Sequence, residues 1–307
     1  MKTLNSSHLT RLAKCLKDVL PPDATGVGVH DIHKRKEQGL AAEMYSFFLT
    51  YVSEGLQKRK DLVLRTYRKG FEKLGPKEFA VLNALKKYNL PVPTAYCLET
   101  DARILGKPFI IMENIIGRTA SHYLNDEAKG QIVIDKMAKI LVRLHKLDPN
   151  CLQNSNVLQE QYELRQRGLL KLRFFIDKRC MNHLFFCPLR QRRFIAAIKR
   201  LEEVKPKKIR PAILHLDYEP DHVLVSNERC IIVDWGETSI GDPAFDVAWT
   251  YHKLRLGREM DKMDLGEKFV KTYEKYMGQR LVNLQFCKDM VALELASRFG
   301  LSPFHAS

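Results

Sequence analysis

The sequence predicts an α+β fold in two parts: a small antiparallel sheet with one helix, followed by a larger, mainly helical part. After an amphipathic helical segment at 1–22, strand-like segments and one further helical segment occupy the chain before Gly117, and helical periodicity dominates after it. The length of 307 residues exceeds that at which one core usually stops growing, so we expect two lobes around a cleft. Hydrophobic residues at 45% and charged residues at 28% are ordinary globular values.

The first elements predict a helix and a hairpin. Residues 1–22 have the pattern of an amphipathic helix that two prolines end. The segments Glu43–Tyr51 and Leu62–Tyr67 are rich in β-branched and aromatic residues, with a polar stretch at Gln57–Lys60 between them. We therefore expect two strands joined by a turn at Gln57–Lys60.

A helix and two more strands follow in the first part. Apolar residues recur at helical spacing within Pro76–Tyr88. The prolines of the next segment, NLPVPTAY, exclude helix there, and Ala95–Glu99 and Pro108–Glu113 read as strands. The order strand, strand, helix, strand, strand predicts an antiparallel sheet with one helix on it.

Helical patterns dominate after Gly117, interrupted by two short strands around a pair of aspartate motifs. No internal repeat or low-complexity linker separates the parts, so we expect the segment Met112–Gly117 to join them directly. The cleft between two such lobes is the expected ligand site. The expected helices are Asp126–His145, Gln159–Asp177, Pro188–Glu203, Pro243–Leu256, Leu265–Met277 and Leu284–Phe299.

Cysteine usage and hydropathy point to a cytoplasmic protein. The seven cysteines are scattered, which argues against a disulfide framework and for a reducing compartment. Cys180, His183 and Cys187 form the one tight group, and three ligands without a fourth make a poor structural zinc site. The N-terminus lacks a secretory apolar core, and no apolar run reaches the roughly 18 residues that span a bilayer.

The formal net charge of +15 is unevenly distributed. Between Gln161 and Arg210 fifteen Lys or Arg stand against four Asp or Glu, a net of +11. The simplest interpretation is a solvated basic helix face, and an anion-binding role near a substrate pocket is the first alternative. Nucleic-acid or lipid binding is the third, but no recognised nucleic-acid-binding motif accompanies the charge, so no nucleic-acid partner is expected.

Two aspartates carry the functional prediction. Asp217 lies before a short loop in HLDYEPDHVLV (215–225), and Asp234 follows an apolar run in IIVDWGETSIGDPAFDVAW (231–249). Two carboxylates beside strands suit phosphoryl transfer, in which one orients an attacking hydroxyl and the other holds the magnesium that neutralises the phosphates.

This pattern resembles the aminoglycoside phosphotransferase and choline kinase family, small-molecule relatives of protein kinases, over roughly residues 35 to 255. The family signature reads H-G-D-x-x-x-x-N, then apolar-apolar-D-W/F-x, then G-D-P-x-x-D. Leu216 stands where glycine is usual and is expected to contribute mainly backbone. His222 stands where asparagine is usual; members that resemble macrolide kinases also place a histidine at this position. The matching residues are His215, Asp217, Asp234, Trp235, Gly241, Asp242, Pro243 and Asp246.

The resemblance implies a bilobal protein-kinase-like fold, with a nucleotide-covering lobe at 1–113 and a lobe at 114–307 that carries the catalytic loop, metal site and substrate helices. It makes Asp217 the catalytic base, or the acceptor that orients the substrate hydroxyl, and Asp234 a ligand of Mg²⁺, with Mn²⁺ as the alternative. His222 would ligate the metal or donate to a phosphate oxygen. The structural alternatives are turn-forming aspartates and a packing histidine. Asp246 and His215 are expected to anchor the catalytic loop.

The resemblance also implies nucleotide-binding residues in the first part. Arg65, in DLVLRTY, takes the place of the phosphate-pairing lysine, with Glu78 as its ion-pair partner; an exposed arginine and a solvated glutamate are the alternatives. In KPFIIMENIIGRT the backbone of Glu113 and Ile115 would bond the adenine edge, and Met112 would line its pocket. The phosphate-covering turn would lie at Gly39–Tyr45, with a single glycine.

The predicted function is a phosphotransferase that moves the terminal phosphate of ATP or GTP to a hydroxyl of a small molecule. The alternative is a kinase-fold nucleotide-binding protein with weak or no turnover, which Arg65, His222 and the sparse glycine turn would suit. The basic charge favours a neutral or anionic acceptor over a polycationic one. Variable helices between Ser155 and Lys208 would recognise the acceptor, with contacts such as Tyr162, Arg165 and Arg173.

Overall fold

The computed structural model describes Leu16 and residues 20–35, 41–101, 105–152, 188–206, 209–256 and 264–299. The chain divides into two compact units. The first comprises Met1–Gly117 and Ile231–Gly236, and the second comprises Arg118–Cys230 and Glu237–Ser307. The first unit therefore includes Asp234, which the sequence analysis assigned to the C-terminal lobe.

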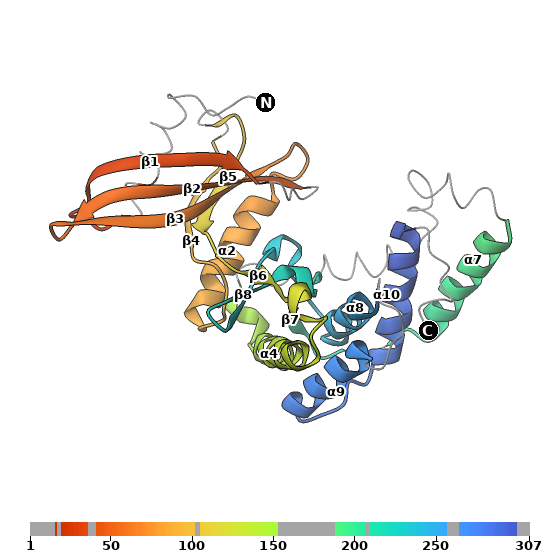
Figure 1. Cartoon of the computed structure of the whole chain (residues 1–307). Coiled ribbons are helices and arrows are strands. Elements are labelled where there is room, and N and C mark those ends of the chain that lie inside the picture. The colour runs from red at the N-terminus through yellow and green to blue at the C-terminus, as the bar shows by residue number, and fades with distance from the viewer. Residues whose placement is uncertain are drawn as a thin grey trace. The chain divides into compact units, whose positions relative to one another are not determined.

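The first unit is built on a five-stranded sheet (Figure 1). All its neighbouring strands are antiparallel, as expected. The first strand was not predicted, because its two glycines and its polar His30 and Asp31 weaken the strand signal; it forms an edge of the sheet, where such residues are tolerated. In spatial order the strands are β1 (Thr25–Lys34), β2 (Ala42–Ser53), β3 (Leu56–Tyr67), β5 (Phe109–Glu113) and β4 (Ala95–Glu99).

The turn between β2 and β3 does not lie where the sequence analysis placed it. Glu54 and Gly55 make the turn, with φ of 54° and 73°, as a two-residue hairpin of type I′ requires. The prediction of a turn at Gln57–Lys60 is wrong, since these residues belong to β3 and pair with Leu49–Val52 of β2. Their polarity reflects a solvent-exposed length of strand, which a charge count cannot distinguish from a loop.

The two faces of this sheet have different roles. Phe47 and Leu49 of β2 and Leu62 and Leu64 of β3 belong to an apolar cluster that also includes Leu16. Because side chains alternate along a strand, residues 63, 65 and 67 of β3 point to the opposite face. Helix α2 (Leu74–Lys87), close to the expected Pro76–Tyr88, packs against β4 and β5. The rest of the helix predicted at 1–22 lies largely outside the described residues.

The second unit is mainly helical (Figure 1). Asp126 caps the first helix by accepting a hydrogen bond from the Lys129 N–H at 3.0 Å. The contacts between helices join α4 with α9, α8 with both α9 and α10, and α7 with α10. Among the described residues, none of the helices combines the length and the apolar composition that crossing a bilayer needs. The helices are α4 (Glu127–His145), α7 (Pro188–Glu203), α8 (Ala244–Arg255), α9 (Leu265–Met277) and α10 (Leu284–Phe299).

These helices match the predicted ranges closely, and the helix expected at Gln159–Asp177 lies outside the described residues, as does the Cys180, His183 and Cys187 group. Short strands frame the aspartate motifs in two small sheets, one of order β10-β7 and one of order β6-β8-β9. They are β6 (Arg118–Thr119), β7 (Ala212–Leu214), β8 (Val223–Ser226), β9 (Arg229–Ile232) and β10 (Ser239–Gly241). Single 3-10 turns are η1 (Ala120–Tyr123), η2 (Pro149–Cys151), η3 (Pro220–His222) and η4 (Trp235–Glu237).

Candidate active site

A buried arginine in the first unit joins two carboxylates. Nη1 of Arg65 lies 3.3 Å from Oε1 of Glu78, and Nη2 lies 2.7 Å from Oδ1 of Asp234. Burial opposes the charge of Arg65, but the negative charges of Glu78 and Asp234 outweigh it and raise the pKa of the guanidinium. The planar fork of arginine can serve two acceptors at once, which a lysine ammonium at the same place would do less directionally.

Glu78 and Asp234 reach this arginine from different elements. Glu78 lies on α2 and is 1% exposed, whereas Asp234 follows β9 and has a φ of 67°. Burial raises the pKa of Glu78, and Arg65 acts against this rise. The hydroxyl of Tyr67 donates to Oε2 of Glu78 at 2.7 Å, and the Trp235 N–H also bonds to this carboxylate. The first unit thus holds one buried cation between a fixed carboxylate and a more exposed one.

The predicted hinge begins at the end of β5. Met112 is buried, and Glu113 closes the strand. The Glu113 carboxylate accepts hydrogen bonds from the N–H and the hydroxyl of Thr94 at 3.1 and 2.9 Å, and the Glu113 N–H donates to the Thr94 carbonyl at 2.8 Å. These bonds fix the chain just before Ile115. The roles of Met112, Glu113 and Ile115 toward a nucleotide base stay predictions.

In the second unit, the loop that carries Asp217 is held by α8. The Asp246 carboxylate accepts the N–H of His215 at 2.7 Å and the N–H of Leu216 at 2.8 Å. His215 in turn accepts the Asp217 N–H at its Nδ1, at 3.3 Å. Both His215 and Asp246 are fully buried. This geometry agrees with the expected anchoring roles of Asp246 and His215.

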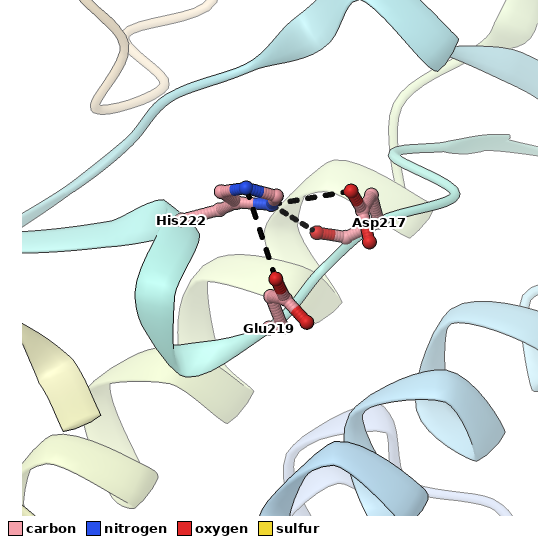
Figure 2. A group of neighbouring side chains, drawn as sticks. All are labelled: Asp217, Glu219 and His222. Carbon is pink, nitrogen blue, oxygen red and sulfur yellow. Dashed lines mark hydrogen bonds and ion pairs between the residues drawn. The ribbon is translucent and has the colours of Figure 1, made fainter. Parts of the chain in front are cut away.

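Asp217, Glu219 and His222 form a cluster at this loop (Figure 2). Nδ1 of His222 lies 2.9 Å from the Asp217 carbonyl oxygen and 3.5 Å from the Asp217 carboxylate, while Nε2 lies 3.8 Å from the Glu219 carboxylate. A carbonyl oxygen can only accept, so Nδ1 carries a proton and Nε2 is the nitrogen that a neutral imidazole offers to a metal. One ligand atom from each residue lies within 4.8 Å of the others, so the donor set fits a divalent cation.

Glu219 has a second partner, because Nζ of Lys253 lies 2.5 Å from its other oxygen. Sequence reasoning missed Glu219. Its position two residues after Asp217 was the available signal, but the family signature leaves that position open.

Leu216 adopts a backbone conformation that leucine rarely takes. Its φ is 66°, in the left-handed region where glycine has no steric cost. The sequence analysis expected this leucine to contribute mainly backbone, but its side chain also takes part in packing. Its side chain is 3% exposed and packs in an apolar cluster with residues of α7, α8 and α10. Burial of the side chain offsets the strain of the backbone.

We predict that Leu216→Gly is more stable than Leu216→Ala. Leu216→Gly relieves about 1–2 kcal/mol of left-handed strain, whereas Leu216→Ala keeps the strain and loses the same buried side chain. The lost packing should lower the free energy of unfolding of both variants by about 2–5 kcal/mol. In Leu216→Gly the relieved strain offsets part of this loss. Urea unfolding of the two variants measures the difference. An alanine variant more stable than the glycine variant would contradict a left-handed Leu216.

The geometry of both units agrees with the result of a family comparison. Residues 45–280 match the phosphotransferase enzyme family, a span of more than three quarters of the chain. The chain belongs to the phosphotransferase enzyme family. This confirms, at the level of the family, the resemblance drawn from the aspartate motifs.

Solved structures share the fold of this phosphotransferase family member at low identity. A candidate aminoglycoside phosphotransferase from Ralstonia eutropha has a TM-score of 0.68 at 19% identity and covers 94% of this chain and 86% of its own. The ternary complex of APH(2″)-IIa with streptomycin and ATP has a TM-score of 0.60 at 17% identity, covering 97% and 92%. Plasmodium vivax ethanolamine kinase has a TM-score of 0.58 at 14% identity, covering 95% and 81%. These likenesses confirm the kinase-like α+β fold.

This chain matches two curated relatives over only part of their length. Acyl-CoA dehydrogenase family member 10 of Mus musculus is 25% identical over 224 residues, which are 68% of this chain and 20% of that protein. Probable acyl-CoA dehydrogenase IBR3 of Arabidopsis thaliana is 27% identical over 211 residues, 64% of this chain and 25% of that protein. The chain thus spans a fifth to a quarter of these relatives, and their dehydrogenase names do not transfer to it.

The predicted site residues of the phosphotransferase fall into two groups. Arg65, Glu78 and Asp234 meet in the first unit, and Asp217 and His222 meet in the second. The convergence of Asp217 and Asp234 on one nucleotide stays a prediction, because the two residues belong to separate units. Of the proposed phosphate-covering turn at Gly39–Tyr45, residues 39 and 40 lie outside the described residues, whereas residues 42–45 belong to strand β2. The candidate acceptor contacts Tyr162, Arg165 and Arg173 lie outside the described residues.

Proposed function

We propose that this protein transfers the terminal phosphate of ATP or GTP to a hydroxyl group of a small molecule. The observation that carries the proposal is the buried Arg65, which pairs with Glu78 and with Asp234. A cation fixed by one carboxylate next to a second, more exposed carboxylate suits a nucleotide whose phosphates need both a cation and a metal ligand.

Arg65 would bind a phosphate oxygen of the nucleotide. Its Nη1 is held by Glu78, so the side chain keeps its direction, while Nη2 can exchange Asp234 for a phosphate oxygen. Asp234 would then hold Mg²⁺ or Mn²⁺, which, when bound, neutralises the charge of the phosphates. The donor set around His222 fits the same kind of cation, with Asp217 and Glu219 as its oxygen ligands.

Asp217 would orient the acceptor hydroxyl and take its proton. Three hydrogen bonds hold the loop on which it stands: the N–H groups of His215 and Leu216 both donate to the Asp246 carboxylate, and the Asp217 N–H donates to the His215 ring. A base must be held within hydrogen-bond reach of the proton that it removes, so this anchoring supports the assignment. Met112, Glu113 and Ile115 would border the base of the nucleotide.

The acceptor is best sought among neutral and anionic alcohols. The net charge of +15 disfavours a polycationic acceptor, although structural neighbours bind streptomycin and gentamicin. An acidic local pocket would reverse this expectation, and the helices proposed to recognise the acceptor lie largely outside the described residues.

A nucleotide-binding protein without turnover is the second candidate. The 2.7 Å contact between Arg65 and Asp234 favours it, because a metal would have to displace this ion pair. Replacement of the usual asparagine by His222 also removes a hard oxygen that Mg²⁺ prefers. Turnover separates the two candidates, since both predict nucleotide binding.

A thermal-shift titration with ATP and GTP, each with and without Mg²⁺ or Mn²⁺, tests nucleotide binding. At a hundredfold excess over the dissociation constant we expect about 2.7 kcal/mol of stabilisation, or roughly 5 °C in Tm, for one nucleotide with metal present. ADP formation over a panel of small-molecule alcohols then tests turnover. No shift with either nucleotide contradicts both candidates, and a shift without turnover favours the second.

Variants of Arg65 connect this binding to the proposed site. Arg65→Ala should abolish the ATP shift and lower the free energy of unfolding by about 3–5 kcal/mol, since Glu78 loses its buried counter-charge. Arg65→Lys is the matched control, because its single ammonium keeps the charge and should retain part of the shift. An unchanged ATP shift in a folded Arg65→Ala variant would show that the phosphates bind elsewhere.

A further inference from the structure

Glu78 divides its two oxygens between different partners. Oε1 faces Nη1 of Arg65 at 3.3 Å, and Oε2 accepts the hydroxyl of Tyr67 at 2.7 Å. Glu78 and Tyr67 are each 1% exposed, so protein groups must satisfy this carboxylate. The Trp235 N–H also bonds to this carboxylate. The contact made by Tyr67 is shorter than that made by Arg65, and the proposed chemistry does not use Tyr67.

We propose that Tyr67 is a positioning residue for the phosphate-binding arginine, because its hydroxyl holds Glu78 in the orientation that directs Arg65. This inference rests on the proposed function. Tyr67 itself does not touch a phosphate in this proposal; it acts through Glu78. The family resemblance assigned roles to Arg65 and Glu78 and none to Tyr67.

The orientation of Arg65 depends on few contacts, which makes Glu78 important. Nε of Arg65 is buried and has no hydrogen-bond partner among the described residues, so Nη1 and Nη2 carry the side chain's polar contacts. Nη2 bonds to Asp234, the carboxylate proposed to take the metal. Nη1 and Glu78 are therefore what would keep Arg65 in place when Asp234 changes partner.

The strand places Tyr67 where it can hold Glu78. Residues two apart on β3 share one face of the sheet, so Tyr67 lies beside Arg65, and the guanidinium carbon is 5.8 Å from the centroid of the Tyr67 ring. Tyr67 adds no negative charge beside Arg65. Burial raises the pKa of its hydroxyl, so the hydroxyl stays a neutral donor. A neutral donor satisfies Oε2 and leaves the charge of Glu78 for Arg65.

Helix α2 makes room for this ring with a glycine. A Cβ atom at Gly75 would lie 2.9 Å from Cε2 and 3.1 Å from Cδ2 of Tyr67, closer than side chains tolerate. Gly75 is buried in the first turn of α2, one turn before Glu78. Absence of a side chain at Gly75 thus lets the Tyr67 ring pass over the helix and reach Glu78. Strand and helix both accommodate the same hydrogen bond.

A buried tyrosine often bonds to a neighbour merely to satisfy its hydroxyl, and the experiment must separate the two roles. Loss of packing would weaken the binding of every ligand alike. Loss of Arg65 orientation would weaken binding of the phosphates and leave the base unaffected. Comparison of ATP with adenosine, in excess Mg²⁺, makes this distinction by isothermal titration; GTP and guanosine replace them if GTP is the nucleotide that binds.

We expect Tyr67→Phe to bind ATP roughly tenfold more weakly than the wild type, the effect of losing one hydrogen bond to a charged group, with adenosine affinity unchanged. Tyr51→Phe is the matched control, since Tyr51 is a buried tyrosine of β2 in the apolar cluster on the opposite face. It should leave both affinities unchanged.

Gly75→Ala provides a second, independent change to the same contact, and it should also weaken ATP binding selectively. Equal ATP affinity in wild type and Tyr67→Phe would overturn the role of Tyr67 and leave the proposed function standing. An equal loss of ATP and adenosine affinity in Tyr67→Phe would also overturn the role of Tyr67 and leave the proposed function standing. A wild-type protein that binds neither ATP nor GTP would overturn both proposals together.

Discussion

Asp217→Asn should lower phosphate transfer by about a thousandfold while nucleotide affinity stays within a factor of two or so, because general-base assistance contributes roughly 10² to 10⁴ in rate. Asparagine matches the shape of aspartate but cannot take the proton of the acceptor hydroxyl. Its amide would still fit near His222, 3.5 Å from the present carboxylate. ADP formation under saturating nucleotide measures the rate, and the thermal shift with ATP measures binding.

Asp221→Asn is the control for this variant. Asp221 is an exposed residue of the 3-10 turn η3, which also contains His222. Asp221→Asn changes the net charge by the same amount as Asp217→Asn. It should leave the rate within about twofold, since a surface charge contributes little. A rate that falls equally in the two variants would mean that charge near the loop matters and that Asp217 is no base. Retention of full rate in Asp217→Asn would remove the proposed mechanism.

The helices and the short motifs were predictable because their signals are local. A helix such as α9 shows its apolar face within 13 residues, and its predicted range, Leu265–Met277, is the range observed. Arg65 and Glu78 were paired through the resemblance, and their side chains do meet. In each case a short stretch of sequence carries the information.

The errors in the sheet have a different cause. Strand pairing is non-local, so the charged first half of β3 looked like a loop although β2 pairs with it along its whole length. The pair Glu54 and Gly55 was a usable signal, since two residues with positive φ make the tightest hairpin turn. Strand β1 had no comparable signal, because an edge strand needs little burial.

The contacts that complete the site were also beyond sequence reasoning. Tyr67 and Gly75 meet because a strand and a helix cross at one point, and no spacing in the sequence encodes that approach. The pairing of Arg65 with Asp234 joins residues 169 positions apart. The left-handed backbone of Leu216 could have been inferred, since glycine is usual at this position and its usual reason is a positive φ.

Asp246→Ala is expected to give the largest loss of stability in the second unit. The Asp246 carboxylate accepts the N–H groups of His215 and Leu216, and Nε2 of His145 lies 3.3 Å from it. Alanine would leave buried donors without an acceptor, at about 1–3 kcal/mol for each, so the free energy of unfolding should fall by roughly 3–6 kcal/mol. It would also release the strained Leu216, and with it the loop that positions Asp217.

Phosphate transfer by Asp246→Ala should therefore be lost even at temperatures where circular dichroism shows a folded protein. Asp126→Ala is the control: this exposed aspartate caps α4, and its replacement should lower the free energy of unfolding by about 1 kcal/mol without affecting the rate. Asp246→Asn should be intermediate, because its amide keeps one acceptor oxygen and turns an N–H toward the other donor. A folded Asp246→Ala variant with full activity would mean that the Asp217 loop holds its conformation without α8, and the anchoring role would have to be abandoned.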